Sequence, residues 1–249
     1  MPKIAICLTT FLREKLLYYA CDSIINYLPE DIILLIADQS KISEEKELKI
    51  NEIKLKIPCE YYRLPFDCGL SYARNFLVQK ANEMNIPYCL IMADSNQFTQ
   101  LYDFQLIIDF LEENPKRGIV GFDLDKSKCE WEYLMEVTPI GLKFSYPTEE
   151  LIFKDIKFTK VDICRNIFLA KTHTLLDLWD NEQKLCEHEL AFLEYKKRGY
   201  EVHWTNHIQL LRYARTSEEY TYFRKRWKEY KDTAKRKLGI PGWIILPKR

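Results

Sequence analysis

The stretch YCLIMADSNQF, residues 88–98, decides the fold of this 249-residue chain. Its first residues, 88–92, are apolar and form the pattern of a buried strand. The run then stops at a small polar cluster, Ala93-Asp94-Ser95-Asn96. In an open parallel sheet, ligands bind beyond the carboxyl ends of the strands, so Asp94 stands where it could hold a phosphate-bound cation or a sugar hydroxyl. An Asx-type turn that only closes the strand is the alternative at this point.

Strands and helices alternate on both sides of this stretch. Short apolar runs predict strands over residues 3–8, 31–37, 59–64, 88–92 and 118–124. Apolar residues at helical spacing predict helices over residues 16–28, 71–85 and 105–113, and the highly charged residues 41–56 predict a solvated helix. Strand–helix–strand order predicts right-handed crossovers between parallel strands. We therefore expect an α/β fold in which helices flank a mostly parallel sheet.

The second half of the chain is less regular. Strands are expected over residues 133–144, 161–169, 201–204 and 208–211, and helices over residues 172–178 and 187–198, while residues 149–160 fit no single element. The tail from residue 217 predicts a basic helix with aromatic side chains at three-to-four spacing, at Tyr220, Phe223, Trp227 and Tyr230. We therefore expect one domain over residues 1–215 and a basic helical tail over residues 216–249.

Composition and charge exclude several classes of function. The 37 Lys and Arg residues balance 37 Asp and Glu residues, so no global field favours nucleic acid as a partner. The N-terminus lacks the core of a signal peptide, and no run reaches the roughly 18 apolar residues that span a bilayer. The eight cysteines form no CxxC pair, which is typical of reduced thiols in a cytoplasmic protein. We expect a cytoplasmic location.

Polar side chains also follow the first two predicted strands. Thr9, Thr10 and Arg13 lie in the exit of the first strand, and Asp38 ends the second. Because the carboxyl ends of parallel strands share one edge of a sheet, these groups should open on the same rim as Asp94.

Two helix starts carry charged residues. Gly69 permits a turn into the helix over residues 71–85, Ser71 is its expected N-cap, and Arg74 in its first turn would make an anion site with the free N–H groups. An Arg on a helix surface is the alternative. Glu187 and Glu189 open the later helix, where carboxylates either complement the helix dipole or serve catalysis.

Taken in order, these pieces resemble the family 2 glycosyltransferases, whose fold is the GT-A nucleotide-sugar-binding domain. The likeness extends over residues 3–237. The stretch at residues 69–75 resembles the family's GxxxARN segment, Asp94-Ser95-Asn96 stands where the family has its DxD motif, and Glu187-His188-Glu189 is similar to its ED/EH motif. The FDxGLSxxRN pattern at residues 66–75 is nearest to the branch that contains N-acetylgalactosaminyltransferases.

The resemblance implies an inverting transfer of a sugar from a UDP-sugar donor to a hydroxyl of a glycan or lipid-linked acceptor. It implies that Glu187 is the base that takes the acceptor's proton, with Glu189 as the second candidate. It implies Asp38 as the contact to the uracil ring, and a divalent cation, Mn²⁺ or Mg²⁺, on Asp94 and Asn96. The donor-binding set that it implies is Thr9, Thr10, Arg13, Asp38, Asp67, Arg74, Asp94, Asn96 and Arg212.

Two departures from the family pattern bear on the metal. Only one carboxylate survives in the DxD position, and Asn is a poorer ligand than Asp for a hard cation. Arg212 stands where the family often has a metal-binding His, and His207 is a displaced alternative. We therefore hypothesise a weakly held or absent metal, with Arg212 and Arg215 on the diphosphate.

Three alternatives stay open at this stage. A nucleotidyltransferase would need a Gly-rich loop near the N-terminus, and residues 7–13 contain no Gly. A catalytically inactive protein that binds nucleotide sugars would explain the degenerate DxD. From residue 218 onward, ten Lys and Arg face four Asp and Glu, so the tail is either a peripheral membrane contact or a helix docked on the domain. We favour docking.

Overall fold

Side chains along the central strands alternate between two apolar cores. In β1 (Ile4–Thr10), Ile6 and Leu8 belong to one core and Ala5 and Cys7 to the other. The strands β2 (Ile32–Asp38) and β4 (Tyr88–Ala93) repeat this division. Because both faces are apolar, both must be covered by other elements. The computed structural model describes residues 2–29, 31–125, 132–213 and 217–244.

The main sheet has the strand order β3-β2-β1-β4-β11-β6-β12-β10-β9, and β5 pairs with β12. Along this order β11 and β10 run against the direction of the other strands. The prediction of a mostly parallel sheet is therefore confirmed. The further strands of this sheet are β3 (Cys59–Arg63), β5 (Asn96–Gln97), β6 (Arg117–Leu124), β9 (Glu150–Phe153), β10 (Ile156–Val161), β11 (Phe168–Lys171) and β12 (Glu201–Arg212).

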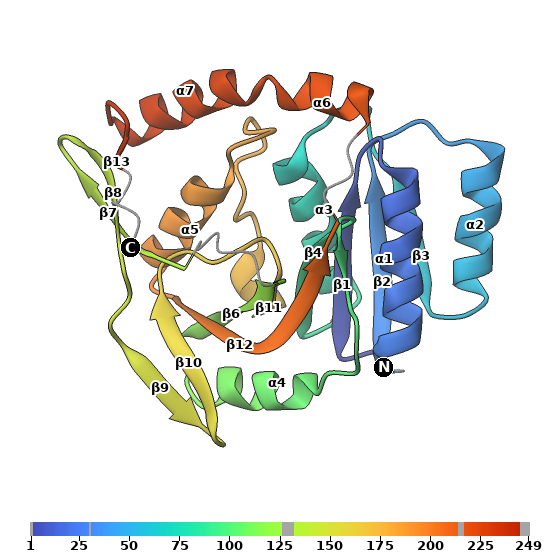
Figure 1. Cartoon of the computed structure of the whole chain (residues 1–249), viewed down its shortest axis with the longest axis horizontal. Coiled ribbons are helices and arrows are strands. Elements are labelled where there is room, and N and C mark those ends of the chain that lie inside the picture. Colours follow the sequence, from blue (N-terminus) through green and yellow to red (C-terminus); the bar gives the residue numbers. More distant parts are fainter. Residues whose placement is uncertain (1, 30, 126–131, 214–216, 245–249) are drawn as a thin grey trace.

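Helices cover both faces of the sheet. The apolar sides of α1, α2 and α4 join one core, and those of α3 and α5 join the other. Two further helices, α6 and α7, lie across the top of the molecule in Figure 1, with α6 toward the upper end of β1 and α7 above α5. The helices are α1 (Glu14–Tyr27), α2 (Glu44–Lys54), α3 (Leu70–Glu83), α4 (Phe104–Glu112), α5 (His188–Lys197), α6 (Glu218–Arg224) and α7 (Trp227–Leu238).

The second half of the chain departs from several predictions. Residues 149–160 form most of a hairpin of β9 and β10. A second sheet has the strand order β13-β8-β7 and consists of β7 (Leu134–Thr138), β8 (Gly141–Ser145) and β13 (Trp243–Ile244). The single strand expected over residues 161–169 was wrong, since β10 ends at Val161 and β11 begins at Phe168. The helix expected over residues 172–178 was also wrong, because only a short 3₁₀ helix, Thr172–Leu175, forms there.

Two other predictions are corrected by long-range contacts. The two short strands expected over residues 201–204 and 208–211 are one strand, β12, whose pairing with β6 shifts between Trp204 and Gln209. The tail forms two helices rather than one, with the break at Lys225 and Arg226. Tyr230 and Ala234 of α7 are buried, which favours the docked-helix interpretation of the tail.

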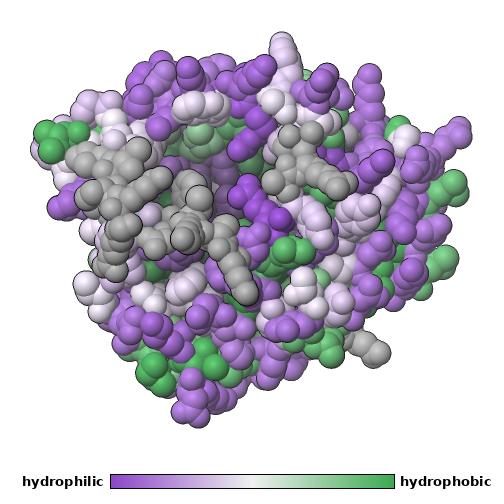
Figure 2. All heavy atoms as spheres, viewed as in Figure 1, coloured by the Kyte–Doolittle hydropathy of each residue, from purple (hydrophilic) through white to green (hydrophobic). Residues whose placement is uncertain are grey.

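The cysteines and the helices of the described residues bear on two further expectations. The seven cysteines of the described residues are free, and Cys129 lies outside them. Within those residues no helix combines the length and the apolar character needed to cross a bilayer. In Figure 2 the upper edge of the molecule, formed by α6 and α7, is mostly hydrophilic.

Candidate active site

The carboxyl ends of β1, β2 and β4 meet at one edge of the sheet. Thr10 of β1 lies beside Asp38 of β2, and Thr9 lies beside Ala93 of β4. A cavity of about 40 Å³ is found at this edge, and Thr9, Thr10, Arg13 and Asp67 of the predicted donor set line it. The strand exits therefore open on one rim, as predicted.

Asp94 follows β4 at this edge and is completely buried. Its Oδ2 accepts hydrogen bonds from Thr10 Oγ1 at 2.8 Å and from Arg13 Nε at 3.2 Å, and Arg13 Nη2 forms an ion pair with its Oδ1. Burial raises the pKa of Asp94 to about 6, against the opposing effect of Arg13 and Thr10. The guanidinium carbon of Arg13 also lies 4.3 Å from the centre of the Tyr220 ring. The carboxylate is thus held by a cation of the chain itself.

Asp38 also lies at this edge, but its carboxylate has partners within the protein. Its Oδ2 accepts hydrogen bonds from Lys46 Nζ at 2.9 Å and from Tyr61 Oη at 2.8 Å, and its Oδ1 accepts one from the Ser40 N–H. The neighbouring Gln39 lines the cavity and accepts a hydrogen bond from the Gly69 N–H. The predicted contact of Asp38 with a uracil ring stays a prediction.

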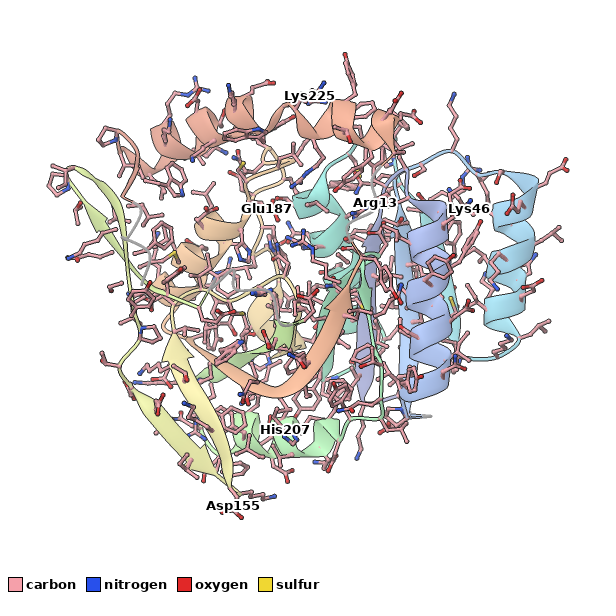
Figure 3. All side chains as sticks on the ribbon, in the orientation of Figure 1. Arg13, Lys46, Asp155, Glu187, His207 and Lys225 are labelled. Atoms are coloured by element: carbon pink, nitrogen blue, oxygen red, sulfur yellow. The ribbon has the colours of Figure 1, made fainter. Side chains whose placement is uncertain are left out.

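Arg74 and Glu187 form a buried ion pair between the first turn of α3 and the residue before α5. Arg74 Nη1 donates a hydrogen bond to Glu187 Oε1 at 2.6 Å, and the two side chains are 3% and 5% exposed. Trp179 places its ring 5.6 Å from the Arg74 guanidinium. Figure 3 shows Glu187 and Arg13 in the same central region, below α6. Two residues that are 113 positions apart in the sequence are therefore brought together in one ion pair.

The start of α3 explains how this pair is positioned. Gly69 is the N-cap residue with a φ of 97°, and a Cβ there would lie 2.7 Å from the backbone of Lys184. The sequence-based prediction that Ser71 is the N-cap was wrong. The Ser71 hydroxyl instead donates a hydrogen bond to the Gln183 carbonyl at 2.6 Å. The Leu70 N–H bonds the Lys184 carbonyl at 3.2 Å. These contacts attach the segment before Glu187 to the first turn of α3.

The two candidate bases have opposite electrostatic environments. Burial alone would raise the pKa of Glu187, but the Arg74 charge and other contacts outweigh it and lower the pKa below its ordinary value. Burial raises the pKa of Glu189, whose Oε1 accepts a hydrogen bond from Trp243 Nε1 at 3.0 Å. Burial also lowers the pKa of His188 to about 4, so this residue is neutral near pH 7. Glu187 is therefore the weaker base and the more firmly ionised group.

The residues at the DxD position do not fit a divalent cation. Both oxygens of Asp94 are engaged by Arg13 or Thr10, and Asn96 Oδ1 accepts a hydrogen bond from the Ala93 N–H at 3.2 Å. Mg²⁺ and related ions prefer several oxygen ligands, chiefly carboxylates, that are free to coordinate. Across the part of the chain that the structure describes, no group of three or more His, Cys, Asp or Glu side chains is arranged to hold a metal.

The sequence offered three residues in place of the family's metal-binding His: Arg212, Arg215 and His207. Arg212 is exposed and pairs with Asn96 where β12 meets β5, and the Tyr213 N–H bonds the Ser95 carbonyl at 2.9 Å. Arg215 lies outside the described residues. His207 lies beside α4 in Figure 3, away from Arg13 and Glu187, which favours a structural role for it over that of a displaced ligand.

The helix α6 covers the cavity. Phe223 packs edge-on against Phe11 and Phe66, with ring centres 5.2 and 5.5 Å apart, and Phe11 also contacts Phe66 at 5.3 Å. Just beyond α6, Arg226 Nη1 bonds Asp67 Oδ2 at 2.7 Å, and Lys184 Nζ lies 3.2 Å from the same oxygen. A volume of about 40 Å³ admits a few water molecules but no nucleotide. The cavity is therefore too small for a nucleotide in this conformation.

Sequence reasoning missed the roles of Lys184, Phe223 and Arg226 as cavity-lining residues. The spacing of the aromatic residues in the tail predicts that one face of its helix is covered. It does not identify the surface that this face packs against. Lys184 and Arg226 meet Asp67 from segments more than a hundred positions away. Such contacts leave no periodic pattern in the sequence.

Comparison with known proteins gives the fold class. No protein-family model matches the sequence. The structure is similar to S. aureus TarS in complex with UDP-GlcNAc, with a TM-score of 0.66 and 11% sequence identity over 93% of this chain and 65% of that chain. It is similar to the mannosyltransferase PcManGT from Pyrobaculum calidifontis in complex with GDP-Man and Mn²⁺, with a TM-score of 0.63 and 11% sequence identity over 94% of this chain and 64% of that chain. It is also similar to GalNAc-T7 with UDP, GalNAc and Mn²⁺, with a TM-score of 0.66 and 12% sequence identity over 94% of this chain and 50% of that chain.

These similarities define a GT-A glycosyltransferase fold for the chain, as expected from the sequence. The identities of 11–12% establish the fold alone. The chain spans about half to two thirds of the length of these three structures, 50–65%. The substrate, the stereochemistry of the reaction and the site residues therefore require arguments from this chain's own geometry.

Proposed function

We propose that this protein is an inverting glycosyltransferase of the family 2 type that uses a UDP-sugar donor and glycosylates a hydroxyl of a glycan or lipid-linked acceptor. One observation carries the proposal: in a GT-A fold, the cavity at the strand ends is lined by the cations Arg13, Lys184, Arg224 and Arg226. Cations at this edge suit the diphosphate of a nucleotide sugar. The similar structures contain UDP, UDP-GlcNAc or GDP-Man, which supports a nucleotide-bound donor.

The proposed reaction needs three roles from the chain. An acceptor oxygen forms a bond to the anomeric carbon of the donor sugar, while the bond from that carbon to the β-phosphate oxygen breaks. The electron pair of the broken bond stays on the leaving diphosphate, and a carboxylate takes the acceptor's proton. Cationic side chains stabilise the charge that develops on the diphosphate.

Glu187 is the proposed base, and Arg74 is its positioning residue. The ion pair fixes the direction of the carboxylate and keeps it ionised. Glu189 is the second candidate because its raised pKa makes it the stronger base. The two assignments differ in their pH dependence. With Glu187 as base, the transfer rate falls only below the ordinary pKa of Glu, whereas with Glu189 it falls at a higher pH.

UDP release from a panel of UDP-sugars, with and without a mixture of glycan and glycolipid acceptors, tests the proposal. We expect UDP release that increases with acceptor, and a loss of about 10²–10⁴-fold in the transfer rate for Glu187→Gln with UDP binding retained. Glu194→Gln, on the same helix and partly exposed, is the matched control and should keep the wild-type rate. If Glu189→Gln alone abolishes transfer, Glu189 is the base.

An inactive nucleotide-sugar-binding protein is the second candidate function. The residues at the DxD position favour it, because they do not fit the divalent cation that would assist the departure of the diphosphate. UDP binding without turnover in any acceptor mixture would establish this candidate. Release of pyrophosphate instead of UDP would indicate a nucleotidyltransferase.

A further inference from the structure

Arg13 is held in place from several directions. It follows Leu12, whose backbone has a φ of 56° and whose N–H donates a hydrogen bond to Ser40 Oγ at 2.7 Å. The Arg13 side chain is 15% exposed. Its Nε and Nη2 face the two oxygens of Asp94, and Tyr220 covers its flat face. The guanidinium therefore has a fixed orientation before any ligand arrives.

The arrangement leaves part of the guanidinium available to the cavity. Asp94 uses Nε and Nη2, while a guanidinium also carries N–H donors on its other terminal nitrogen. Arg13 lines the cavity together with Thr10 and Lys184. A planar cation with spare donors at this position suits the oxygens of a diphosphate.

From these contacts we infer that Arg13, anchored by Asp94, takes the place of the divalent cation, so that the diphosphate of the donor is bound and neutralised without a metal. The inference rests on the proposed function. Asp94 is then the anchor of a guanidinium rather than a metal ligand. This role differs from the sequence-based hypothesis, which assigned the diphosphate to Arg212 and Arg215.

The chemistry of the leaving group is consistent with this role. When the bond between the anomeric carbon and the β-phosphate oxygen breaks, the diphosphate gains negative charge. A guanidinium is a permanent cation in proteins, so Arg13 keeps its charge throughout the reaction. It donates hydrogen bonds and charge to the diphosphate but no proton, and it needs no reorganisation because Asp94 and Tyr220 already hold it.

Calorimetric titration with UDP, in buffer that contains either EDTA or MnCl₂, tests the inference. For the wild-type protein we expect the same affinity within about twofold in both buffers. Arg13→Ala should lower the affinity in EDTA by roughly 10- to 100-fold, the effect of losing hydrogen bonds to a charged group. Arg13→Lys, which keeps the charge and loses the planar fork, should fall between the two. Arg236→Ala, an exposed guanidinium on α7, is the control and should bind like the wild type.

Each remaining outcome overturns the inference in a recognisable way. Wild-type binding that requires Mn²⁺ would overturn it and leave the proposed function standing. Loss of binding in Arg212→Ala, with Arg13→Ala unaffected, would assign the diphosphate to Arg212 instead. Absence of UDP binding in both buffers would overturn the inference together with the proposed function.

Discussion

His203 is a buried histidine whose ring has no hydrogen-bond partner on either nitrogen. It lies on β12, fully buried, with its ring edge-on to Phe110 at 5.0 Å. Burial lowers its pKa from 6.5 to about 4. The cost of burying an unpaired polar ring is thus present in the folded state at neutral pH, and a larger cost appears when the ring must take up a proton.

The pH dependence of stability follows from this shift. Between pH 6.5 and about 4 the unfolded chain binds the proton and the folded protein does not, so the free energy of unfolding falls as the pH falls through this range. The loss from His203 is about 3 kcal/mol, from a shift of more than two pKa units. His203→Leu should remove this loss, so its stability relative to the wild type should rise by about 3 kcal/mol on acidification.

Urea denaturation of the two proteins at about pH 7 and about pH 4.5 measures this difference. His188, whose pKa is also lowered to about 4, is present in both proteins and cancels in the comparison. A stability difference that is the same at both pH values would contradict the prediction.

The positions of individual polar residues could be predicted from the sequence more accurately than the residues that they contact. Asp38 and Asp94 lie at the expected strand ends because strand ends can be located from apolar runs and turn residues. Their ion pairs could not be predicted. Lys46 lies in the segment expected to be a solvated helix, yet it is 1% exposed and bonds Asp38, and Figure 3 shows it between α1 and α2. In a stretch rich in Lys and Glu, periodicity does not identify the one Lys that turns inward.

Among the elements, α6 governs access to the site. Phe223 is the side chain that attaches this helix to Phe11 and Phe66, and an edge-on aromatic pair contributes about 0.5–1.5 kcal/mol. Phe223→Ala should therefore favour the open position of α6 by roughly tenfold. Hydrogen exchange of the α6 amides should become faster by that factor, and UDP should associate faster.

Tyr222 provides the matched control for this prediction. It is the neighbouring aromatic residue of α6 and is 68% exposed, so Tyr222→Ala should leave both rates unchanged. Equal amide exchange in the wild type and in Phe223→Ala would show that the Phe223 contacts do not hold α6 over the cavity.

The element boundaries that the sequence missed depend on tertiary contacts. The break between α6 and α7 has no Gly or Pro to mark it, and Arg226 at the break bonds Asp67 and Tyr230. β12 was expected as two short strands, and in the structure it is one strand whose pairing with β6 shifts after Trp204. The hairpin of β9 and β10 adds itself to the edge of the sheet through β12. None of these features has a local cause that a pattern could reveal.

One half of the main sheet has a strand order that the sequence predicts, and the other half does not. The strands β3, β2, β1 and β4 are joined through helices, and this alternation predicts parallel pairing of neighbours in sequence. β11 lies between β4 and β6, and β10 lies between β12 and β9, so the other half pairs segments that are distant or antiparallel. The strand ends that line the cavity belong to the predictable half, which is why Thr9 and Thr10 could be placed at this edge from the sequence.

The cations that line the cavity predict how the stability of the whole molecule responds to a donor nucleotide. UDP at about 100 times its dissociation constant should add about 2.7 kcal/mol to the free energy of unfolding, which raises the melting temperature by roughly 5–10 °C for a chain of this size. Because the net charge is zero, the effect should come from the local cluster of cations and not from a general attraction of anions. Uridine and inorganic pyrophosphate, which each carry half of the ligand, should raise the melting temperature less than UDP does. A thermal-shift series with all three compounds makes the measurement, and equal shifts for UDP and pyrophosphate would argue against a nucleotide site.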